Sequence, residues 1–186
     1  MEWSTACKDW ERRIVEREPL IPFAPLFPDM ADEAWDVFSH LVMVDVDGQP
    51  TMGEICLPWL EHWVRAIFGA RHPETGRQLI NEFFLMVSKK NGKSSIAAGV
   101  LLTALILNWR PSAELLILSP TKEIAENSFK PIRDMINADE ELQALLKVQE
   151  YQRLITHREN NATLKVVAAD SDTVSGKKAS FVFVDE

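Results

Sequence analysis

The sequence predicts an α/β fold in which helices cover both faces of a parallel sheet. In the second half of the chain, short apolar runs alternate with longer segments whose apolar residues recur at helical spacing. Such runs are typical of parallel strands, which are buried on both faces. The chain has 186 residues, and 46% of them are hydrophobic, which is enough for one substantial core. We therefore expect one main domain with a smaller appendage.

The first 56 residues predict the appendage, which combines helices with a hairpin. Apolar and charged side chains recur at helical spacing near the start, and four closely spaced prolines then exclude a regular helix. An Asp-Gly pair further on is typical of a tight hairpin turn. The expected elements are a helix at 5–18, an extended apolar strap at 19–28, a helix at 31–39 and a hairpin that turns at Asp47 and Gly48 into 51–56.

Residues 57–186 predict the main domain. It opens with a helix that carries two tryptophans on a heavily apolar face and ends at Gly69. Apolar runs and helices then alternate in the order that a parallel sheet requires. The expected strands are 83–87, 115–118, 163–168 and 181–184, and the expected helices are 93–108 and 121–136.

The strongest chemical signal is the segment VSKKNGKS at residues 87–94, which lies between an expected strand and an expected helix. A loop in this context turns backbone N–H groups inward, and the helix adds its positive N-terminal end, so the segment predicts a phosphate-binding P-loop. Lys93 would reach the β- and γ-phosphates, and Ser94 would bind magnesium. Val87 replaces the first glycine of the usual pattern, and a lysine-rich surface turn is the alternative interpretation. The nucleotide-binding candidates are Lys89, Lys90, Asn91, Gly92, Lys93 and Ser94.

The last six residues predict the second half of a nucleotide site. Four apolar residues at 181–184 precede Asp185 and Glu186, which is the pattern of a Walker B strand. The carboxyl end of such a strand opens beside the P-loop, so Asp185 is predicted to hold magnesium and Glu186 to polarise the attacking water. An ordinary strand end is the alternative. A glutamate directly after the aspartate favours hydrolysis over transfer to a substrate hydroxyl.

Charge, cysteines and hydropathy add only broad limits. The net charge of -8 does not indicate a surface that binds many nucleic-acid phosphates at once, although a local basic loop would suffice for a motor. Cys7 and Cys56 have no metal-binding spacing and are expected to be free thiols in a reducing cytosol. The longest apolar run, 97–107, is too short to span a bilayer. We expect a soluble intracellular protein.

These segments together resemble the ATPase domain of large terminase subunits, which package DNA into the heads of tailed bacteriophages. That family commonly lacks the first P-loop glycine, has a basic residue before Asn-Gly-Lys-Ser, and carries an upstream Trp-bearing helix that ends in Phe-Gly. The corresponding segments here are Lys89–Ser94, Leu57–Trp59 with Phe68 and Gly69, Leu118–Ala125, and Asp9–Ile14. The resemblance covers nearly the whole chain.

The resemblance implies an αβα P-loop NTPase fold of the RecA-like (ASCE) kind, with ATP and Mg²⁺ as cofactors. Glu186 and Lys93 would be the catalytic residues, and Ser94 and Asp185 the metal ligands. The implied partners are double-stranded DNA, a portal protein, a small terminase subunit and further copies in a ring, without a membrane, in the cytoplasm of the bacterial host. The family's chain continues past Glu186 into a coupling motif and then a nuclease domain, which are not part of this sequence. A complete P-loop domain would also need further strands, so we expect an incomplete sheet.

Two features depart from the family pattern. Leu60 follows the upstream tryptophan where the family often has an adenine-contacting glutamine, so no residue is assigned to adenine and Trp59 is expected in the core. Some members carry an arginine before the Walker B strand that acts on a neighbouring subunit's nucleotide. Lys177 and Lys178 occupy that loop here, and a lysine lacks the planar fork of arginine. The alternatives are a helicase-like translocating ATPase and a catalytically silent nucleotide-binding fragment.

Overall fold

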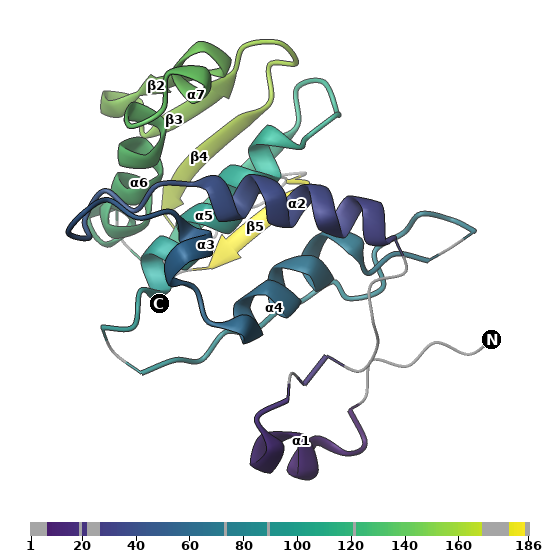
Figure 1. The fold of residues 1–186 in the computed structure, drawn as a ribbon. Coiled ribbons are helices and arrows are strands. Elements are labelled where there is room, and N and C mark those ends of the chain that lie inside the picture. The colour runs from purple at the N-terminus through teal and green to yellow at the C-terminus, as the bar shows by residue number, and fades with distance from the viewer. Residues whose placement is uncertain are drawn as a thin grey trace. The chain divides into compact units, whose positions relative to one another are not determined.

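The computed structural model describes residues 7–18, 20–21, 27–72, 74–88, 90–120, 122–168 and 179–184. The chain divides into two compact units, each made of two stretches of sequence. The first comprises Met1–His40 and Met52–Val87, and the second comprises Leu41–Thr51 and Ser88–Glu186. Each unit is described by itself below, with the elements labelled as in Figure 1.

The first unit is helical within its described residues. Its helices are α1 (Trp10–Glu16), α2 (Pro28–His40), α3 (Met52–Ile55) and α4 (Pro58–Gly69). Helices α2 and α4 contact each other along buried apolar stripes. Arg65 of α4 joins them through ion pairs to Asp32 of α2 and Glu61 of its own helix. Helices were predicted in the regions of α1, α2 and α4, but α2 begins three residues earlier than expected, because Pro28 is suited to the first turn of a helix.

The hairpin predicted around Asp47 and Gly48 is only partly correct. Val42 and Thr51 form an antiparallel bridge, and Gly48 takes a positive φ of 77° in the turn between them. The second arm was expected to run to residue 56, but the chain enters the short helix α3 at Met52. The side chain of Met52 is fully buried in this helical turn, and α3 contacts α2.

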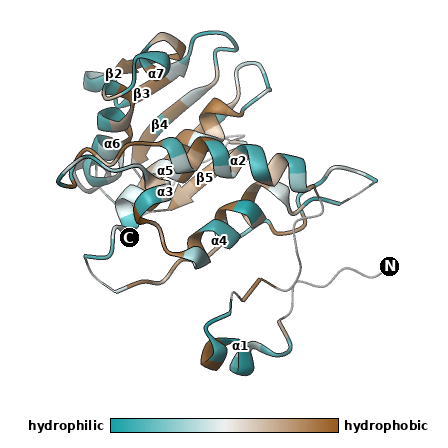
Figure 2. Ribbon diagram, viewed as in Figure 1, coloured by the Kyte–Doolittle hydropathy of each residue, from teal (hydrophilic) through white to brown (hydrophobic). Residues whose placement is uncertain are grey.

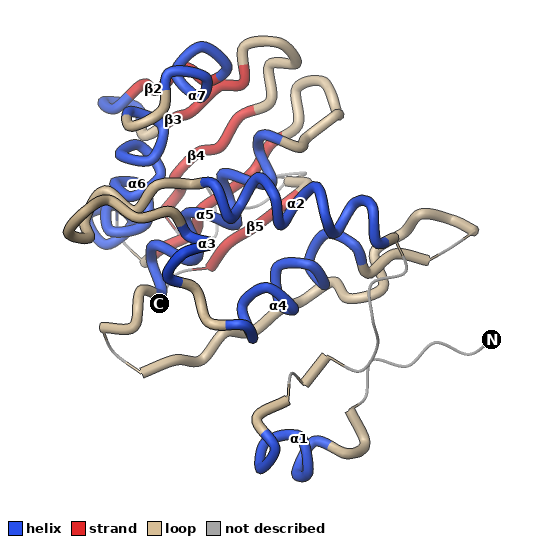
Figure 3. Tube along the Cα trace, in the orientation of Figure 1, coloured by secondary structure: helices blue, strands red, loops and turns tan. Residues whose placement is uncertain are grey.

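The strand predicted at residues 83–87 is absent, although the structure describes every residue of this segment. Figure 3 shows the chain between α4 and α5 as loop. Phe84 and Met86 are 83% and 81% exposed, whereas Phe83 packs edge-on against Trp63 with ring centroids 6.1 Å apart. Apolar residues favour an extended chain, but a strand also requires a hydrogen-bonded neighbour, and this segment has no strand partner within the described residues.

The second unit contains a five-stranded sheet in the order β2-β3-β4-β1-β5. Its strands are β1 (Glu114–Ser119), β2 (Leu146–Gln149), β3 (Leu154–His157), β4 (Thr163–Ala168) and β5 (Phe181–Val184). Strand β1 pairs in parallel with β4 on one side and β5 on the other, as predicted. The hairpin β2–β3 was not predicted, and it adds two strands through antiparallel pairing of β3 with β4, so the sheet is mixed.

Three helices of the second unit accompany the sheet: α5 (Lys93–Ile106), α6 (Lys122–Asn137) and α7 (Glu140–Leu145), with a 3₁₀ turn at Glu150–Gln152. Helix α5 is buried on nearly every side, and Figure 2 shows it and the central strands as largely hydrophobic. It contacts β4, β5 and α6, while α6 also contacts β1 and β4. Both long helices end within two residues of their predicted positions.

One face of the sheet is better buried than the other along β5. Phe181 and Phe183 are half-buried, whereas Val182 and Val184 are 46% and 71% exposed on the opposite face. Because α5 contacts β5, it must cover the face that carries the two phenylalanines. We call this the helix-covered face. In β1, the fully buried Leu115 and Ile117 lie on it, since they are the register partners of Phe181 and Phe183.

Candidate nucleotide-binding site

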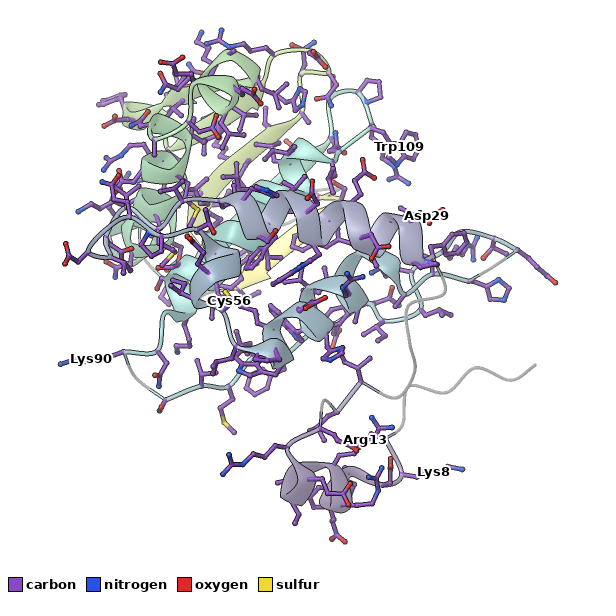
Figure 4. The ribbon with its side chains drawn as sticks, in the orientation of Figure 1. Lys8, Arg13, Asp29, Cys56, Lys90 and Trp109 are labelled. Atoms are coloured by element: carbon purple, nitrogen blue, oxygen red, sulfur yellow. The ribbon has the colours of Figure 1, made fainter. Side chains whose placement is uncertain are left out.

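The loop before α5 has the backbone shape expected of an anion-binding loop. Lys90 and Gly92 have positive φ angles of 70° and 71°, with Asn91 between them in the ordinary range. Alternating backbone handedness of this kind turns successive N–H groups toward one concave side. The side-chain amide of Asn91 donates to the backbone carbonyl oxygen of Ser88 at 3.2 Å and also to the Ser88 hydroxyl, which closes the loop on itself. The Lys90 side chain extends away from the ribbon (Figure 4).

The N-terminus of α5 is positive and carries no side-chain cap. Gly92 is the N-cap residue, so no side chain accepts a hydrogen bond from the first turn of α5. That turn contains no acidic residue. Lys93 is exposed at the first helical position and Ser94 is half-buried behind it. Lys93 adds its charge to the positive end of the helix dipole, and anions bind favourably at such an end. The arrangement therefore suits a ligand that carries several negative charges.

The direction of α5 places this N-terminus near one edge of the sheet. The side chain of Asn160, in the turn before β4, donates to the carbonyl oxygen of Asn108 at 2.6 Å, and the Ser112 amide donates to the Asn160 carbonyl at 2.8 Å. The end of α5 is thereby fixed at the amino edge of β1 and β4. The 14 residues of α5 span about 21 Å and the six residues of β1 span about 20 Å, so the helix is about as long as the strand. Since α5 lies against β4 and β5, its N-terminus reaches the carboxyl edge.

The three parallel strands end at that same edge. Strand β1 ends at Ser119, β4 at Ala168 and β5 at Val184, and Leu118 and Val184 are the last register partners of β1 and β5. Asp185 and Glu186 follow Val184 in the sequence but lie outside the described residues, as do Lys89, Lys177 and Lys178. The fold thus brings together the loop residues 88 and 90–92, Lys93, Ser94 and the strand that leads to the two acids. Because the strand expected at 83–87 is absent, α5 and not a preceding strand positions the loop at this edge.

Sequence reasoning missed one residue at this edge. Ser119 is fully buried, and its hydroxyl finds no hydrogen-bond partner within the part of the chain that the structure describes. A serine at the end of an otherwise apolar strand, Glu114–Ser119, was the available signal. It was not sufficient, because burial and the lack of a partner appear only in three dimensions.

Comparison with known proteins agrees with this architecture. Residues 58–186, well over half of the chain, match the family model for the ATPase domain of the terminase large subunit. The chain belongs to the terminase large subunit family. The crystal structure of the large terminase of bacteriophage HK97 has a similar fold, with a TM-score of 0.69 at 20% identity. The similarity covers 84% of this chain and 31% of the HK97 chain, so this chain spans less than a third of that protein's length. No curated protein matches the sequence.

The structure bears on two further expectations from the sequence of this terminase chain, the burial of Trp59 and the state of the two cysteines. Trp59, expected in the core, is only half-buried, because the buried face of α4 is formed by Leu60, Val64 and Ile67. Cys7 and Cys56 are both free thiols, as predicted. Of the helices in the described ranges, none is long and apolar enough to cross a membrane. The individual roles of the predicted site residues remain predictions.

Proposed function

We propose that this terminase chain binds ATP with Mg²⁺ at the carboxyl edge of its sheet. The observation that carries the proposal is the N-terminus of α5, which is uncapped, bears Lys93 and follows a loop with positive φ at Lys90 and Gly92. The helix end supplies N–H groups and a positive dipole, and the lysines supply charge. A triphosphate is the anion that uses all of these features together.

The residues present fit such a ligand. A Cβ added at Gly92 would meet nothing within 4 Å, so the loop is open at this residue, and loop and helix offer donors and positive charge. Lys89, Lys90, Asn91, Gly92, Lys93 and Ser94 would hold the phosphates. Ser94 and Asp185 would hold Mg²⁺, which, when bound, offsets the charge that develops on the phosphates during transfer.

The chain's own contribution to hydrolysis would be positioning and proton transfer. Lys93 would draw charge from the terminal phosphate, and Glu186 would accept a proton from the water that attacks it. Glu186 directly follows Asp185, so both side chains would come from the end of β5, beside the N-terminus of α5. This division of roles is that of an ATPase that activates water.

In the larger protein, ATP hydrolysis would drive double-stranded DNA into the procapsid. Membership of the terminase large subunit family supports this role. The expected partners are DNA, the portal protein, the small terminase subunit and further copies of the same chain in a ring, in the cytoplasm of the bacterial host. A helicase-like translocating ATPase is disfavoured because the matched family is that of packaging enzymes.

The test is to measure binding and turnover separately on the purified chain. Calorimetry with a non-hydrolysable ATP analogue and Mg²⁺ should show saturable binding, and the matched Lys93→Ala chain should not bind. Phosphate release from ATP then distinguishes an active enzyme from a silent nucleotide-binding module, which would bind without turnover. Absence of binding by the unaltered chain would refute the proposed site.

A further inference from the structure

The loop that follows α5 presents an exposed tryptophan to solvent. Trp109 is 76% exposed, and the guanidinium of Arg110 lies over its ring, 5.4 Å from the ring centre. Figure 4 shows the Trp109 side chain pointing away from the ribbon. Arg110 has no ion pair among the residues that the structure describes. Tryptophan and arginine are enriched where proteins bind one another, so this pair has the composition of an interaction surface.

Hydrogen bonds hold the backbone of this loop in one shape. The side chain of Asn108 donates to the Arg110 carbonyl at 2.8 Å, and the Asn108 carbonyl accepts from the Asn160 side chain at 2.6 Å. The Ser112 amide donates to the Asn160 carbonyl at 2.8 Å. Trp109 lies between these anchored residues. A side chain on a preordered loop loses less entropy on binding than one on a loose loop, which favours a tight contact.

A patch of opposite charge lies at the start of α7. Glu140 and Glu141 occupy the first turn of this helix, both are exposed, and neither forms an ion pair within the described part of the chain. The preceding Asp139 is engaged in capping the helix, since its side chain accepts from the amides of Glu141 and Leu142. Two carboxylates on adjacent residues are therefore available to a cation from outside.

The β3–β4 turn separates these two patches, although both belong to the second unit. On one side, the Arg158 amide of this turn donates to the Leu145 carbonyl at the end of α7. On the other side, Asn160 holds the loop that carries Trp109. In the shared orientation of Figures 1 and 4, α7 and Trp109 lie on opposite sides of β4. The two patches of one chain therefore face different neighbours.

We propose that the Trp109 loop of one copy docks on the first turn of α7 in a second copy, with Arg110 facing Glu140 and Glu141. The inference deepens the assembly of copies in the proposed function and rests on it. The chain has 28 acidic and 20 basic residues, whereas the loop 107–112 carries Arg110 and no acid, so a second copy offers the complementary charge. Because two different patches meet, copies join head to tail, and such contacts close into a ring when the rotation between copies permits.

The first experiment measures self-association of the purified chain by sedimentation velocity over a range of concentrations. Trp109→Ala should weaken association about tenfold or more, the scale for a central interface residue. Trp10→Ala is the matched control, because it removes a tryptophan that is 50% exposed in the other unit, and association should be unchanged. Both side chains are largely exposed, so neither variant should lower the Tm.

Charge reversal tests the pairing of the two patches. Arg110→Glu alone, and the double variant Glu140→Arg with Glu141→Arg alone, should each remain monomeric, because like charges then meet at the contact. A mixture of these two proteins should associate, since every contact between unlike chains again joins opposite charges. Arg158→Glu reverses the charge of another exposed arginine at the same edge of the sheet and should associate like the unaltered chain.

The outcomes separate this contact from the rest of the proposed function. Association that is indifferent to Trp109→Ala, or a mixture of the reversed variants that stays monomeric, would overturn the contact and leave nucleotide binding and the ring untouched. If Trp109→Ala weakens binding to duplex DNA and leaves self-association unaltered, the loop serves nucleic acid and the inference is wrong. If the unaltered chain stays monomeric at every concentration, with and without Mg-ATP, the proposed assembly of copies fails as well.

Discussion

The side chain of Asn160 donates to the backbone carbonyl of Asn108 at 2.6 Å, across 52 residues of sequence. Asn108 lies just after α5, and Asn160 lies in the turn between β3 and β4. The same asparagine accepts from the Ala162 amide through its side-chain oxygen at 2.9 Å. One residue therefore joins the end of α5 to the amino edge of the sheet, and in doing so it directs the N-terminus of α5 toward the opposite edge.

Replacing Asn160 with alanine should destabilise the chain by about 1–3 kcal/mol, because the half-buried Asn108 carbonyl and the backbone amide of the buried Ala162 lose their partners. Urea unfolding followed by circular dichroism measures this change. Asn81→Ala is the matched control, since Asn81 is exposed and its side chain has no hydrogen bond to any residue that the structure describes. Equal midpoints for the two variants would show that the link to Asn108 contributes nothing.

The stability of variants at Gly92 should depend on how well the new residue adopts a left-handed backbone conformation and not on the size of its side chain. Its φ is 71°, and an added Cβ would meet no atom within 4 Å. Gly92→Ala should therefore cost about 1 kcal/mol through strain alone, and Gly92→Asn should cost less because asparagine tolerates left-handed backbone. Thermal unfolding of both variants checks the order. If Gly92→Asn is the less stable of the two, steric crowding and not backbone strain governs this position.

The loop lysines should differ in their effect on nucleotide binding. Lys93→Ala should abolish detectable binding of Mg-ATP, because this side chain lies at the positive end of α5, where a triphosphate would be held. Lys89→Ala should have a smaller effect, since residue 89 comes earlier in the loop. Lys130→Ala, at an exposed position of α6, serves as the control for loss of one positive charge. Calorimetry with a non-hydrolysable analogue measures all three, and equal losses at Lys89 and Lys93 would mean that the phosphates lie elsewhere.

The elements predicted best from the sequence are those whose apolar residues form a pattern within the element itself. Helices α5 and α6 have long periodic segments, and β1, β4 and β5 are continuous apolar runs, so each was placed within two residues. Their parallel pairing followed from the alternation with helices. The sheet edge at which the candidate site is proposed follows from these elements, although the strand expected before the loop is absent.

The elements that sequence missed depend on contacts between distant residues. Strands β2 and β3 have only four residues each and mix apolar with polar side chains, so neither forms a recognisable run. They are held by pairing with each other and by the ion pair of Arg153 with Glu126 of α6, at 2.9 Å. Conversely, residues 83–87 have a clear apolar run but no strand partner among the described residues, which no local pattern can reveal.

Cys56 should react with thiol reagents only slowly at neutral pH. Burial raises its pKa from the ordinary value of 9.0 to about 11, because the thiolate would lie in apolar surroundings that include the Met52 sulfur, 3.9 Å away. At pH 8 only about one molecule in a thousand then carries the reactive thiolate, and the rate of alkylation should rise about tenfold per pH unit until the pH approaches 11.

The same shift predicts how stability depends on pH in the alkaline range. The folded chain holds the Cys56 proton more tightly than the unfolded chain, so the associated stability is fully present below pH 9.0 and is lost as pH rises through about 11. Iodoacetamide labelling followed by mass spectrometry gives the rate at each pH, and Cys56→Ala isolates the reaction of Cys7, the other free thiol. Labelling of Cys56 at pH 7 as fast as that of a free cysteine would show that solvent reaches the thiol and that the segment around α3 opens readily. A slow rate that rises steadily toward pH 11 would instead show that the half-buried environment persists in solution.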